Sequence, residues 1–368
     1  MNDFHQKMMR RALQLARKGV GRTSPNPSVG AVVVRDGAIV GEGWHRRAGT
    51  PHAEVHALGM AGESARGADV YVTLEPCSHH GRTPPCADAL VAAGVARVFV
   101  GMIDPNPLVS GRGVARLRQA GIAVESGVLE AECLRLNEAF VKHVTTGRPF
   151  VVLKSALTLD GKSATACGDS RWITSVPSRR LVHRLRATMD GVMVGVGTLL
   201  ADDPELTVRL VKGRNPLRIV VDSGLRTPPD ARLLAPAGSG GVVLATTCDD
   251  TAKLSVFAGA GAELLLCRER DGRVDLADML ERLGARGVQS ILLEGGETLA
   301  GEMLRQGLID KFLFFLAPKL VGGEGKGLFA GAGATLMNQA VPLRIARVSR
   351  VGEDILLEAY PEAACLQG

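Results

Sequence analysis

Two short stretches of this chain gather side chains that bind metals. The stretch EPCSHHGRTPPC, residues 75–86, contains two cysteines and two histidines, and PHAEVHA, residues 51–57, contains two more histidines around a glutamate. Thiolate and imidazole groups are the ligands that zinc prefers in proteins. Donors from separate stretches can hold one ion only if the fold brings them together. This pattern therefore constrains the fold more than any other feature of the sequence.

The rest of the first half predicts alternating strands and helices. An opening helix is followed by a hairpin around Asp36-Gly37, a strong turn signal, and by a helix from about Ala53. Further strands are expected at DVYVTL, RVFVG and IAVESG, with helices after Pro85 and at GVARLRQA. A last helix is expected from about Glu130 to Thr146, and Gly147-Arg148-Pro149 would stop it.

A second series of strands and helices begins at FVVLKSALTLDGK. A chain of 368 residues exceeds one typical domain, so we expect two α/β domains, residues 1–147 and 148–368. The segments of the second domain that predict strands are GVMVGVG, LRIVVD, GVVLAT, AELLLC, SILLEGG and KFLFFLAP.

Composition narrows the class of protein only a little. A net charge of +6 is mild for this length and suits small anionic ligands as well as nucleic acid. The N-terminus has no continuous apolar h-region and no apolar run approaches eighteen residues, so neither a signal peptide nor a membrane span is predicted. Five of the seven cysteines are scattered, which favours a reducing compartment and a cytoplasmic protein; they are Cys133, Cys167, Cys248, Cys267 and Cys365.

The metal-binding residues suggest a catalytic zinc site. His52, Cys77 and Cys86 supply one imidazole and two thiolates, and a catalytic zinc takes three protein ligands and a water molecule. Glu54 would receive a proton from that water, whose pKa zinc lowers toward about 7, and deliver it to a departing amine. Zinc nucleobase deaminases carry H-x-E followed by P-C-x-x-C. Here eight residues, SHHGRTPP, separate the two cysteines.

Other ligands and another metal stay open at this point. His56 lies four residues from His52 and could form a zinc pair with it, but Glu54 would then lack a role, so His56 is interpreted as a core residue or a neighbour of the ligands. His79 and His80 are close to Cys77 and are expected to face substrate or solvent. Iron could occupy the same donors.

The first half as a whole resembles a known family. The runs NPSVGAVVV, GEGWHRRAG, PHAEVHAL, YVTLEPCSHHGRTPPC and DPNPLVSGRG are similar to the deaminase half of the bifunctional riboflavin-biosynthesis deaminase–reductases. The resemblance implies a cytidine-deaminase-like three-layer α/β/α domain of the CMP/dCMP type that acts on a diaminopyrimidine carrying ribose 5-phosphate. It also implies that Asn26 and His45 contact the pyrimidine ring and that His79 and Arg82 lie near the ribose phosphate.

A glycine pair in the second half suggests a phosphate site. In SILLEGGETLAGEML, a strand is followed by Gly295-Gly296 and by a helix from about Thr298. Glycines allow close backbone approach, and a helix N-terminus offers free N–H groups to an anion. A tight turn would have the same sequence. No G-x-G-x-x-G follows the first strand, so an ordinary dinucleotide fold is not supported.

The second half resembles the reductase half of the same family. LKSALTLDGK, SRWITS, GVGTLLADDPELTVR and EGGETLAG occur in the family's order. The resemblance implies a dihydrofolate-reductase-like fold that uses NADPH. The implied cofactor residues are Ala156, Trp172, Thr198, Asp202, Ser223, Gly296, Glu297, Thr298, Leu299, Ala300, Gly301 and Glu302. The implied substrate residues are Ser170, Arg186, Leu206, Arg209 and Glu294.

The types of these residues suit reduction of a ribosylamine. Lys154 and Glu294, each at a strand end, could manage protons or polarise the sugar, and Arg186 and Arg209 could hold the 5-phosphate through paired hydrogen bonds. Asp160 in TLDG is as consistent with a turn as with catalysis. The adjacent acids of Asp202-Asp203-Pro204 are expected to diverge and to cap a turn.

The resulting hypothesis is a bifunctional enzyme with one zinc ion in its deaminase domain. It would convert 2,5-diamino-6-(5-phosphoribosylamino)pyrimidin-4-one to 5-amino-6-(5-phosphoribosylamino)uracil with ammonia release, and then reduce the ribosyl group with NADPH to give the ribityl compound. The expected partner is this small phosphorylated pyrimidine, without nucleic acid or membrane, in a dimer or tetramer. Two alternatives are a deaminase that edits nucleic acid and a non-catalytic protein with structural zinc.

Overall fold

The computed structural model describes residues 3–78, 84–107, 109–236, 238 and 240–362. The chain forms two compact units, Met1–Gly147 and Arg148–Gly368. Each unit has its own sheet and its own hydrophobic core. Among the described residues, every helix is too short or too polar to cross a membrane.

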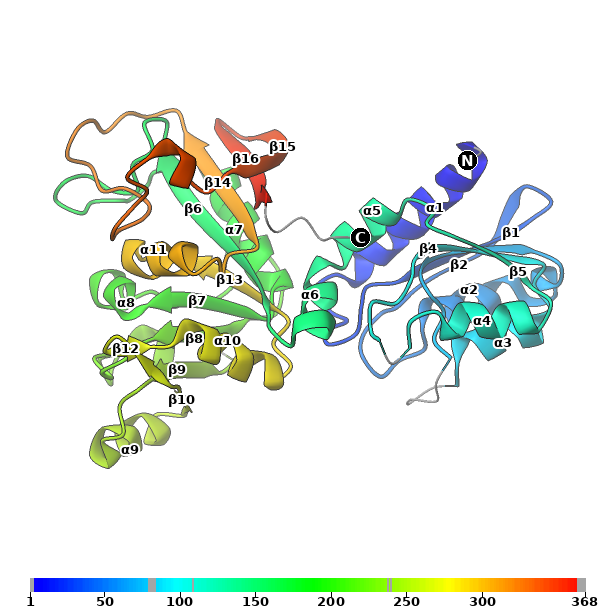
Figure 1. The fold of residues 1–368 in the computed structure, drawn as a ribbon, viewed down its shortest axis with the longest axis horizontal. Coiled ribbons are helices and arrows are strands. Elements are labelled where there is room, and N and C mark those ends of the chain that lie inside the picture. The colour runs from blue at the N-terminus through cyan, green and yellow to red at the C-terminus, as the bar shows by residue number, and fades with distance from the viewer. Residues whose placement is uncertain (1–2, 79–83, 108, 237, 239, 363–368) are drawn as a thin grey trace. The chain divides into compact units, whose positions relative to one another are not determined.

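The first unit contains a five-stranded mixed sheet with the strand order β2-β1-β3-β4-β5 (Figure 1). β1 is antiparallel to β2 and β3, whereas β3, β4 and β5 are parallel. The hairpin turn between β1 and β2 lies at Asp36 and Gly37, both with positive φ, as its sequence predicts. The strands are β1 (Gly30–Arg35), β2 (Ala38–Trp44), β3 (Asp69–Leu74), β4 (Arg97–Met102) and β5 (Ala123–Ser126).

Helices cover both faces of this sheet. α1 and α5 pack on one face, and α2, α3 and α4 follow one another across the other (Figure 1). Gly30 faces α1 and Gly43 faces α2, and the two glycines point to opposite faces because Gly43 pairs with Ala31, the neighbour of Gly30. The helices are α1 (Asp3–Ala16), α2 (Ala53–Ala61), α3 (Cys86–Ala93), α4 (Arg112–Gln119), α5 (Glu130–Leu136) and α6 (Glu138–Thr146), with short 3-10 turns η1 (Arg17–Gly19) and η2 (Gly62–Ala65).

The prediction of a single helix from Glu130 to Thr146 is wrong, because the helix is interrupted at Asn137 and forms two helices, α5 and α6. The Asn137 side chain accepts a hydrogen bond from the Ser28 backbone N–H (2.8 Å) and donates one to the Ser28 carbonyl (3.1 Å). Asn137 itself has non-helical dihedrals, φ −112° and ψ 21°. A partner 109 residues away in the sequence thus ends the helix.

The second unit contains a nine-stranded sheet with the order β10-β9-β8-β7-β13-β6-β14-β16-β15. The first seven strands in this order are parallel to one another. β16 is antiparallel to its two neighbours, β14 and β15. Its strands are β6 (Phe150–Thr158), β7 (Gly191–Gly195), β8 (Leu217–Val221), β9 (Val242–Thr246), β10 (Ala262–Leu266), β13 (Ser290–Glu294), β14 (Lys311–Ala317), β15 (Leu343–Val351) and β16 (Asp354–Pro361); β11 (Glu269–Arg270) and β12 (Arg273–Val274) form a separate pair.

The central strands β7, β8, β9 and β13 of this sheet are buried on both faces, as their nearly continuous apolar sequences predict. In β7, Val192 and Val194 belong to one core and Met193 to the other. Side chains of α10 and α11 complete the core that contains Met193, and those of α8 and α9 complete the opposite one. The helices are α7 (Val176–Thr188), α8 (Val196–Asp202), α9 (Thr251–Gly259), α10 (Leu276–Ala285) and α11 (Glu297–Arg305), with 3-10 turns η3 (Arg232–Leu234) and η4 (Met337–Gln339).

The hairpin of β15 and β16 was not predicted from the sequence. A register shift between Ile345 and Arg347 interrupts the alternation of β15, so the apolar residues of this strand do not repeat every second position. Ile345 and Val348 remain 59% and 61% exposed. The apolar pattern that marks a half-buried strand is therefore weak here.

Candidate functional site

Three metal-binding side chains of the first unit converge at the start of two helices. His52 precedes the first residue of α2, Cys77 follows β3, and Cys86 is the first residue of α3. Their donor atoms lie within 4.8 Å of one another, with His52 Nδ1 at 3.2 Å from Cys86 Sγ and 3.6 Å from Cys77 Sγ. One imidazole and two thiols at this spacing fit the ligand set of a catalytic zinc ion.

The two thiols differ in acidity because they interact with each other. The hydrogen bond with Cys86 and, after it, the hydrogen bond with His52 together lower the pKa of Cys77 to about 4, although burial opposes the shift. The same hydrogen bond, together with burial, raises the pKa of Cys86. A divalent cation would hold both as thiolates, because metal binding displaces the thiol protons.

Glu54 lies in the first turn of α2, beside the three donors, and is buried. Burial raises the pKa of Glu54 to about 7, and the charge of Cys77 adds to the shift. Its Oε2 atom is buried and has no hydrogen-bond partner among the described residues. An unpartnered buried carboxylate oxygen at a three-donor cluster fits a group that exchanges protons with a metal-activated water molecule.

The donors open onto a cavity of about 540 Å³. Asn26 and His45, which the family resemblance assigns to the substrate, both line it. His45 Nδ1 lies 3.3 Å from the Pro51 carbonyl and Nε2 lies 3.2 Å from Asn26 Nδ2. Burial lowers the pKa of His45, so the neutral ring donates from Nδ1 and accepts at Nε2. The other lining residues include Pro25, Pro27, His52, Glu54, Glu75, Cys77, Asp104, Asn106, Val109 and Phe140.

The sequence also contains three histidines and one arginine that were predicted to lie around the ligands or to face the substrate. His56 is outside the group of three donors, and burial lowers its pKa. His79, His80 and Arg82 lie outside the described residues.

Two glycines of β2 set the position of α2, and thereby that of His52 and Glu54. A Cβ atom at Gly43 would overlap the Ala53 carbonyl oxygen and lie 2.6 Å from the Ala57 nitrogen, and one at Gly41 would overlap the Ala57 carbonyl oxygen. The start of α2 therefore rests directly on the strand backbone. The sequence GEG permits this approach because glycine has no side chain.

Replacing Gly43 by Ala is therefore expected to displace the start of α2 and to weaken zinc binding about tenfold or more, since outer supports of metal ligands have effects of this size. Zinc affinity is measured by competition with a chelating dye. The control is Gly59→Ala in the same helix, where a Cβ would meet nothing within 4 Å. This control should leave zinc affinity unchanged and stabilise the helix by about 0.5–1 kcal/mol. Equal zinc affinity in the two variants would contradict the expectation.

In the second unit, three charged side chains meet where the carboxyl end of β13 lies beside the middle of β6. Glu294 is the last residue of β13, as expected, but Lys154 is the fifth of the nine residues of β6, so its expected place at a strand end is wrong. Lys154 and Glu294 are direct register partners on these parallel strands. Arg186 of α7 binds Glu294 with two hydrogen bonds, from Nε (2.6 Å) and Nη2 (3.1 Å), and Lys154 Nζ lies 3.6 Å from Glu294 Oε2. Side-chain exposures are only 19%, 9% and 12% for Lys154, Glu294 and Arg186.

Charge compensation keeps the buried carboxylate of Glu294 ionised. Burial would raise the pKa of Glu294, but Arg186 and then Lys154 outweigh it and lower that pKa to about 2. Burial lowers the pKa of Lys154, with Glu294 opposing the shift. A lysine with a lowered pKa beside an ionised carboxylate is a suitable acid–base pair.

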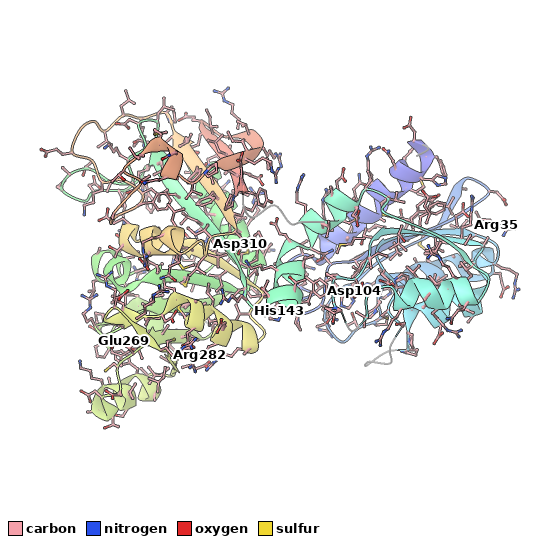
Figure 2. All side chains as sticks on the ribbon, viewed as in Figure 1. Arg35, Asp104, His143, Glu269, Arg282 and Asp310 are labelled. Atoms are coloured by element: carbon pink, nitrogen blue, oxygen red, sulfur yellow. The ribbon has the colours of Figure 1, made fainter. Side chains whose placement is uncertain are left out.

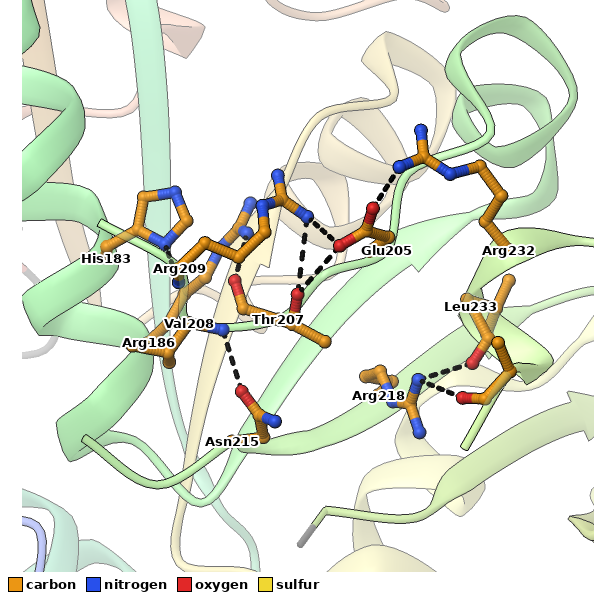
Figure 3. A network of polar contacts seen from close by, with 11 residues as sticks. His183, Arg186, Glu205, Thr207, Val208, Arg209, Asn215, Arg218, Arg232 and Leu233 are labelled. Carbon is orange, nitrogen blue, oxygen red and sulfur yellow. Dashed lines mark hydrogen bonds and ion pairs between the residues drawn. The ribbon is translucent and has the colours of Figure 1, made fainter. Parts of the chain in front are cut away.

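The phosphate role expected for Arg186 stays a prediction, and contacts within the protein already use three of its five N–H donors. Two of its nitrogens bind Glu294, and Nη1 donates to the Thr207 carbonyl (3.0 Å). Arg209 is half exposed and is held by Glu205 and by the Thr207 hydroxyl (Figure 3). Arg209 is therefore the better candidate for an anionic group of the substrate.

The other two expected substrate residues of this unit have different surroundings. The side chain of Leu206 is buried in a core cluster, with φ 55°, so only its backbone could meet a substrate. Ser170 is half-buried.

The expected cofactor residues lie along the same end of the sheet. Gly295 and Gly296 have φ of 73° and 84°, and Gly296 precedes the first residue of α11 without a side-chain cap. A Cβ at Gly296 would lie 3.1 Å from Thr198 Oγ1 of α8, so the two segments are adjacent. Gly296, Glu297 and Thr298 thus provide the free N–H groups at the start of a helix.

The later residues of this run face elsewhere. The side chains of Leu299 and Ala300 are buried in a core cluster, and a Cβ at Gly301 would overlap the Ala330 carbonyl oxygen. Glu302 is paired with Arg305, whose hydrogen bond lowers the pKa of Glu302 to about 2. A ligand at the helix start would meet the first residues of the run and not the last, because only the first N–H groups of a helix are unpaired.

The remaining expected cofactor residues are partly engaged with other groups. Trp172 is 62% exposed and stacks under the Arg179 guanidinium at 4.1 Å. Asp202 pairs with Arg171. Ser223 Oγ accepts a hydrogen bond from the Val274 N–H (3.0 Å), and Ala156 is half-buried on β6.

Three acids of the second unit have contacts of their own, and those of Asp160 favour the turn over the catalytic alternative that its sequence also allowed. Asp160 accepts hydrogen bonds from the Thr158 hydroxyl and from the backbone N–H groups of Val321 and Gly322. Asp203 accepts from the Arg232 N–H, while Asp202 pairs with Arg171. Asp160 therefore fastens a turn, and the two adjacent acids point to different partners.

His183 lies three residues before Arg186 on α7 and was not predicted to belong to the site. His183 Nδ1 accepts a hydrogen bond from the Arg209 backbone N–H at 3.0 Å (Figure 3). Burial, and then the charges of Arg186 and Arg209, lower the pKa of His183 to about 4. A neutral histidine thus holds the backbone of Arg209. The i, i+3 spacing to Arg186 was the one available signal in the sequence.

Comparison with known proteins supports both halves. Residues 2–102 match the family model of the cytidine and deoxycytidylate deaminase zinc-binding region, and residues 149–357 match that of the RibD C-terminal domain. Riboflavin biosynthesis protein RibD of Actinobacillus pleuropneumoniae is 47% identical over 95% of this chain and 93% of its own length. The chain belongs to the RibD family. It is therefore a bifunctional deaminase and reductase of riboflavin biosynthesis.

Other RibD proteins agree in sequence and in structure. The Escherichia coli K12 protein is 46% identical over 95% of this chain and 97% of its own length. The Acinetobacter baumannii RibD structure has a TM-score of 0.88 at 39% identity, covering 97% of this chain and 99% of that one. A Thermotoga maritima structure, described as a diaminohydroxyphosphoribosylaminopyrimidine deaminase/5-amino-6-(5-phosphoribosylamino)uracil reductase, has a TM-score of 0.86 at 39% identity, covering 97% and 99%.

The expected fold class is confirmed by these matches: a cytidine-deaminase-like α/β/α domain followed by an α/β reductase domain. RibD membership also implies a zinc-binding deaminase half and a reductase half with an NADPH-type cofactor.

Proposed function

We propose that residues 1–147 deaminate 2,5-diamino-6-(5-phosphoribosylamino)pyrimidin-4-one to 5-amino-6-(5-phosphoribosylamino)uracil, and that residues 148–368 reduce this product to 5-amino-6-(5-phosphoribitylamino)uracil with NADPH. The observation that carries the deaminase assignment is the buried Glu54, with one unpartnered oxygen beside the converging His52, Cys77 and Cys86. The reactions named for the Thermotoga maritima relative support the choice of substrate.

His52, Cys77 and Cys86 would hold one zinc ion, which when bound activates a water molecule for attack by lowering its pKa. Glu54 takes up the proton of that water and releases it to the departing amine. A pKa of about 7 suits both transfers, because a group that must gain and then lose a proton works best near the ambient pH.

Asn26 and His45 would orient the pyrimidine ring at the cavity wall. The neutral His45 ring accepts the hydrogen bond of Asn26 Nδ2, and the carboxamide oxygen of Asn26 would accept hydrogen bonds from ring N–H or amino groups of the substrate. His79 and Arg82, which lie between the two cysteines in the sequence, would meet the ribose phosphate.

In the reductase half, Gly296, Glu297 and Thr298 would bind a phosphate of NADPH, with Thr198 beside them. Ala156, Trp172, Asp202 and Ser223 would form other parts of the cofactor site. NADPH, when bound, would supply a hydride to C1 of the ribosyl group after the C1–O4 bond has opened, with the N–H proton passing to O4 and a C1=N imine formed. Lys154 would donate the proton that the imine nitrogen takes up, Glu294 would keep Lys154 oriented, and Ser170, the backbone of Leu206 and Arg209 would bind substrate.

We further propose a homodimer or tetramer. The hairpin of β15 and β16 ends the nine-stranded sheet and exposes Ile345, Val348 and Ile355, by 59%, 61% and 37%. An exposed apolar strand at a sheet edge is a common surface for self-association.

Separate assays of the two reactions test the division of function. Removing zinc with a chelator is expected to abolish ammonia release from the diaminopyrimidine, because the three donors and Glu54 then lack the activated water. NADPH oxidation with the deaminated uracil should continue, since its residues all lie in the second unit. Added zinc should restore ammonia release.

Ammonia release that persists after complete zinc removal would contradict the deaminase proposal. Absence of NADPH oxidation by the intact chain would contradict the reductase proposal. A salt-sensitive affinity for tRNA or single-stranded DNA would favour the nucleic-acid alternative.

A further inference from the structure

Glu75 is a buried carboxylate that neither the metal nor the substrate assignments above employ. It follows β3 and is 5% exposed. Its Oε2 atom accepts hydrogen bonds from the backbone N–H groups of Asp104 (3.1 Å) and Gly111 (2.9 Å), and Oε1 accepts one from the N–H of Val114 (3.0 Å). One side chain thus binds three backbone groups of a segment about 30 to 40 residues further along the chain.

The segment that Glu75 binds joins β4 to α4. Figure 2 labels Asp104 in this segment. The start of α4 has no side-chain cap of its own and no acidic residue in its first turn. The first N–H groups of a helix lack partners within the helix and favour a negative charge. Glu75 supplies both the acceptors and the charge that the local sequence of α4 does not provide.

A close backbone contact reinforces this junction. A Cβ atom at Gly113 would overlap the Pro76 carbonyl oxygen and lie 3.2 Å from Glu75 Cγ. The first turn of α4 therefore rests on the Glu75-Pro76 backbone. Cys77, one of the three metal donors, is the next residue.

The same segment forms a wall of the deaminase cavity. Asp104, Asn106 and Val109 line the cavity, together with Glu75 and Cys77. Asn106 is held in a turn in which its N–H donates to Asp104 Oδ1 (2.9 Å). Glu75 is thus the connection between a metal donor and a wall that faces the substrate.

We infer that Glu75 is a positioning residue, which orders the cavity wall of residues 104–107 and 109–111 before the substrate binds. This inference rests on the proposed deaminase function. A wall that is ordered before binding loses little conformational entropy when the substrate binds. Because this entropic cost is avoided, the affinity for the substrate is higher. These three hydrogen bonds do not involve Glu54 or the three metal donors. Glu75 therefore acts on KM more than on kcat.

The test is Glu75→Gln in the full-length chain with zinc. Gln keeps the length of the side chain but turns one acceptor oxygen into a donor that faces a backbone N–H group. The KM for the diaminopyrimidine is expected to rise about tenfold, with kcat changed less than about threefold. Amide hydrogen exchange at Asp104, Gly111 and Val114 should accelerate about tenfold or more. Zinc content and NADPH oxidation should equal those of the parent.

Asp88→Asn is the matched control. Asp88 also joins α3 to α4, through a hydrogen bond from Arg116 Nε (2.8 Å), but the pair lies at the surface with side-chain exposures of 43% and 48%. This variant should leave KM, kcat and exchange at the three amides unchanged, because exposed ion pairs contribute little.

A second variant keeps the test decisive if Glu75→Gln loses zinc. Glu75→Asp retains both carboxylate oxygens on a shorter side chain and should give a KM between those of the parent and Glu75→Gln, with zinc bound. Zinc loss in both variants, a fall in kcat at constant KM, or an unchanged KM each overturns the inference. If the parent chain itself releases no ammonia, the proposed function fails instead.

Discussion

The variant Glu54→Gln is expected to release ammonia about 10²- to 10⁴-fold more slowly than the parent, the range in which a general acid–base group contributes. Glu54 is buried at the three metal donors, and its pKa is raised to about 7, so it can take and give a proton near neutral pH. Gln has nearly the same shape but cannot accept this proton. The measurement is ammonia release under saturating diaminopyrimidine.

Two properties of the same variant serve as its controls. Zinc content should be unchanged, because Glu54 is not one of the three donors. NADPH oxidation with the deaminated uracil should also be unchanged, because Glu54 belongs to the first unit. Ammonia release at the parent rate would contradict the role of Glu54 and would favour a structural metal site.

The variant Glu294→Gln is expected to destabilise the second unit by about 3–5 kcal/mol, because it leaves two buried cations without their carboxylate. Glu294 binds Arg186 through two hydrogen bonds and lies 3.6 Å from Lys154 Nζ. Reductase kcat should fall about 100-fold or more, since Lys154 loses the group that orients it. Hydrogen exchange of the β6 and β13 amides measures the stability of this unit, and NADPH oxidation measures the activity.

The control for this variant is Glu281→Gln. Glu281 binds Arg148 and Arg268 in the same unit, but its side chain is 47% exposed. The change in unfolding free energy should stay below about 1 kcal/mol, with unaltered reductase activity. Equal destabilisation by both substitutions would show that the buried cluster contributes no more to the unfolding free energy than an exposed ion pair does.

The pH dependence of stability gives an independent measure of the same carboxylate. The pKa of Glu294 is about 2 in the fold, against an ordinary value of 4.5. As the pH falls below 4.5, Glu294 takes up a proton in the unfolded chain, whereas in the folded chain it stays ionised down to about pH 2. The parent should therefore lose about 3 kcal/mol of stability across this window as the pH falls. Glu294→Gln should lack this part of the acid dependence.

Much of the fold follows from local patterns in the sequence. Apolar runs predict β1, β3, β4 and the central strands of the second sheet, because a buried strand must carry apolar side chains along its length. Positive φ at Asp36 and Gly37 is what their dipeptide predicts for a hairpin. The β15–β16 hairpin was missed because a register shift interrupts its alternation.

The types of the site residues were also readable. His52 and Glu54 stand two residues apart at the start of one helix, and each cysteine adjoins the end or the start of an element. Such local spacing indicates zinc chemistry before any fold is known. The deaminase and reductase assignment, which the family matches bear out, depended further on resemblance over the whole chain.

What the sequence determined by itself is therefore the order of most elements and the donor set of the deaminase half. The tertiary structure alone decided which distant groups meet: Asn137 ends a helix by binding Ser28, Arg186 binds Glu294, and Glu75 caps a helix 39 residues later. These contacts depend on sheet register and on the packing of helices against the sheets. Neither leaves a periodic pattern or a fixed spacing in the chain, because a hydrogen bond requires only that two groups meet in space.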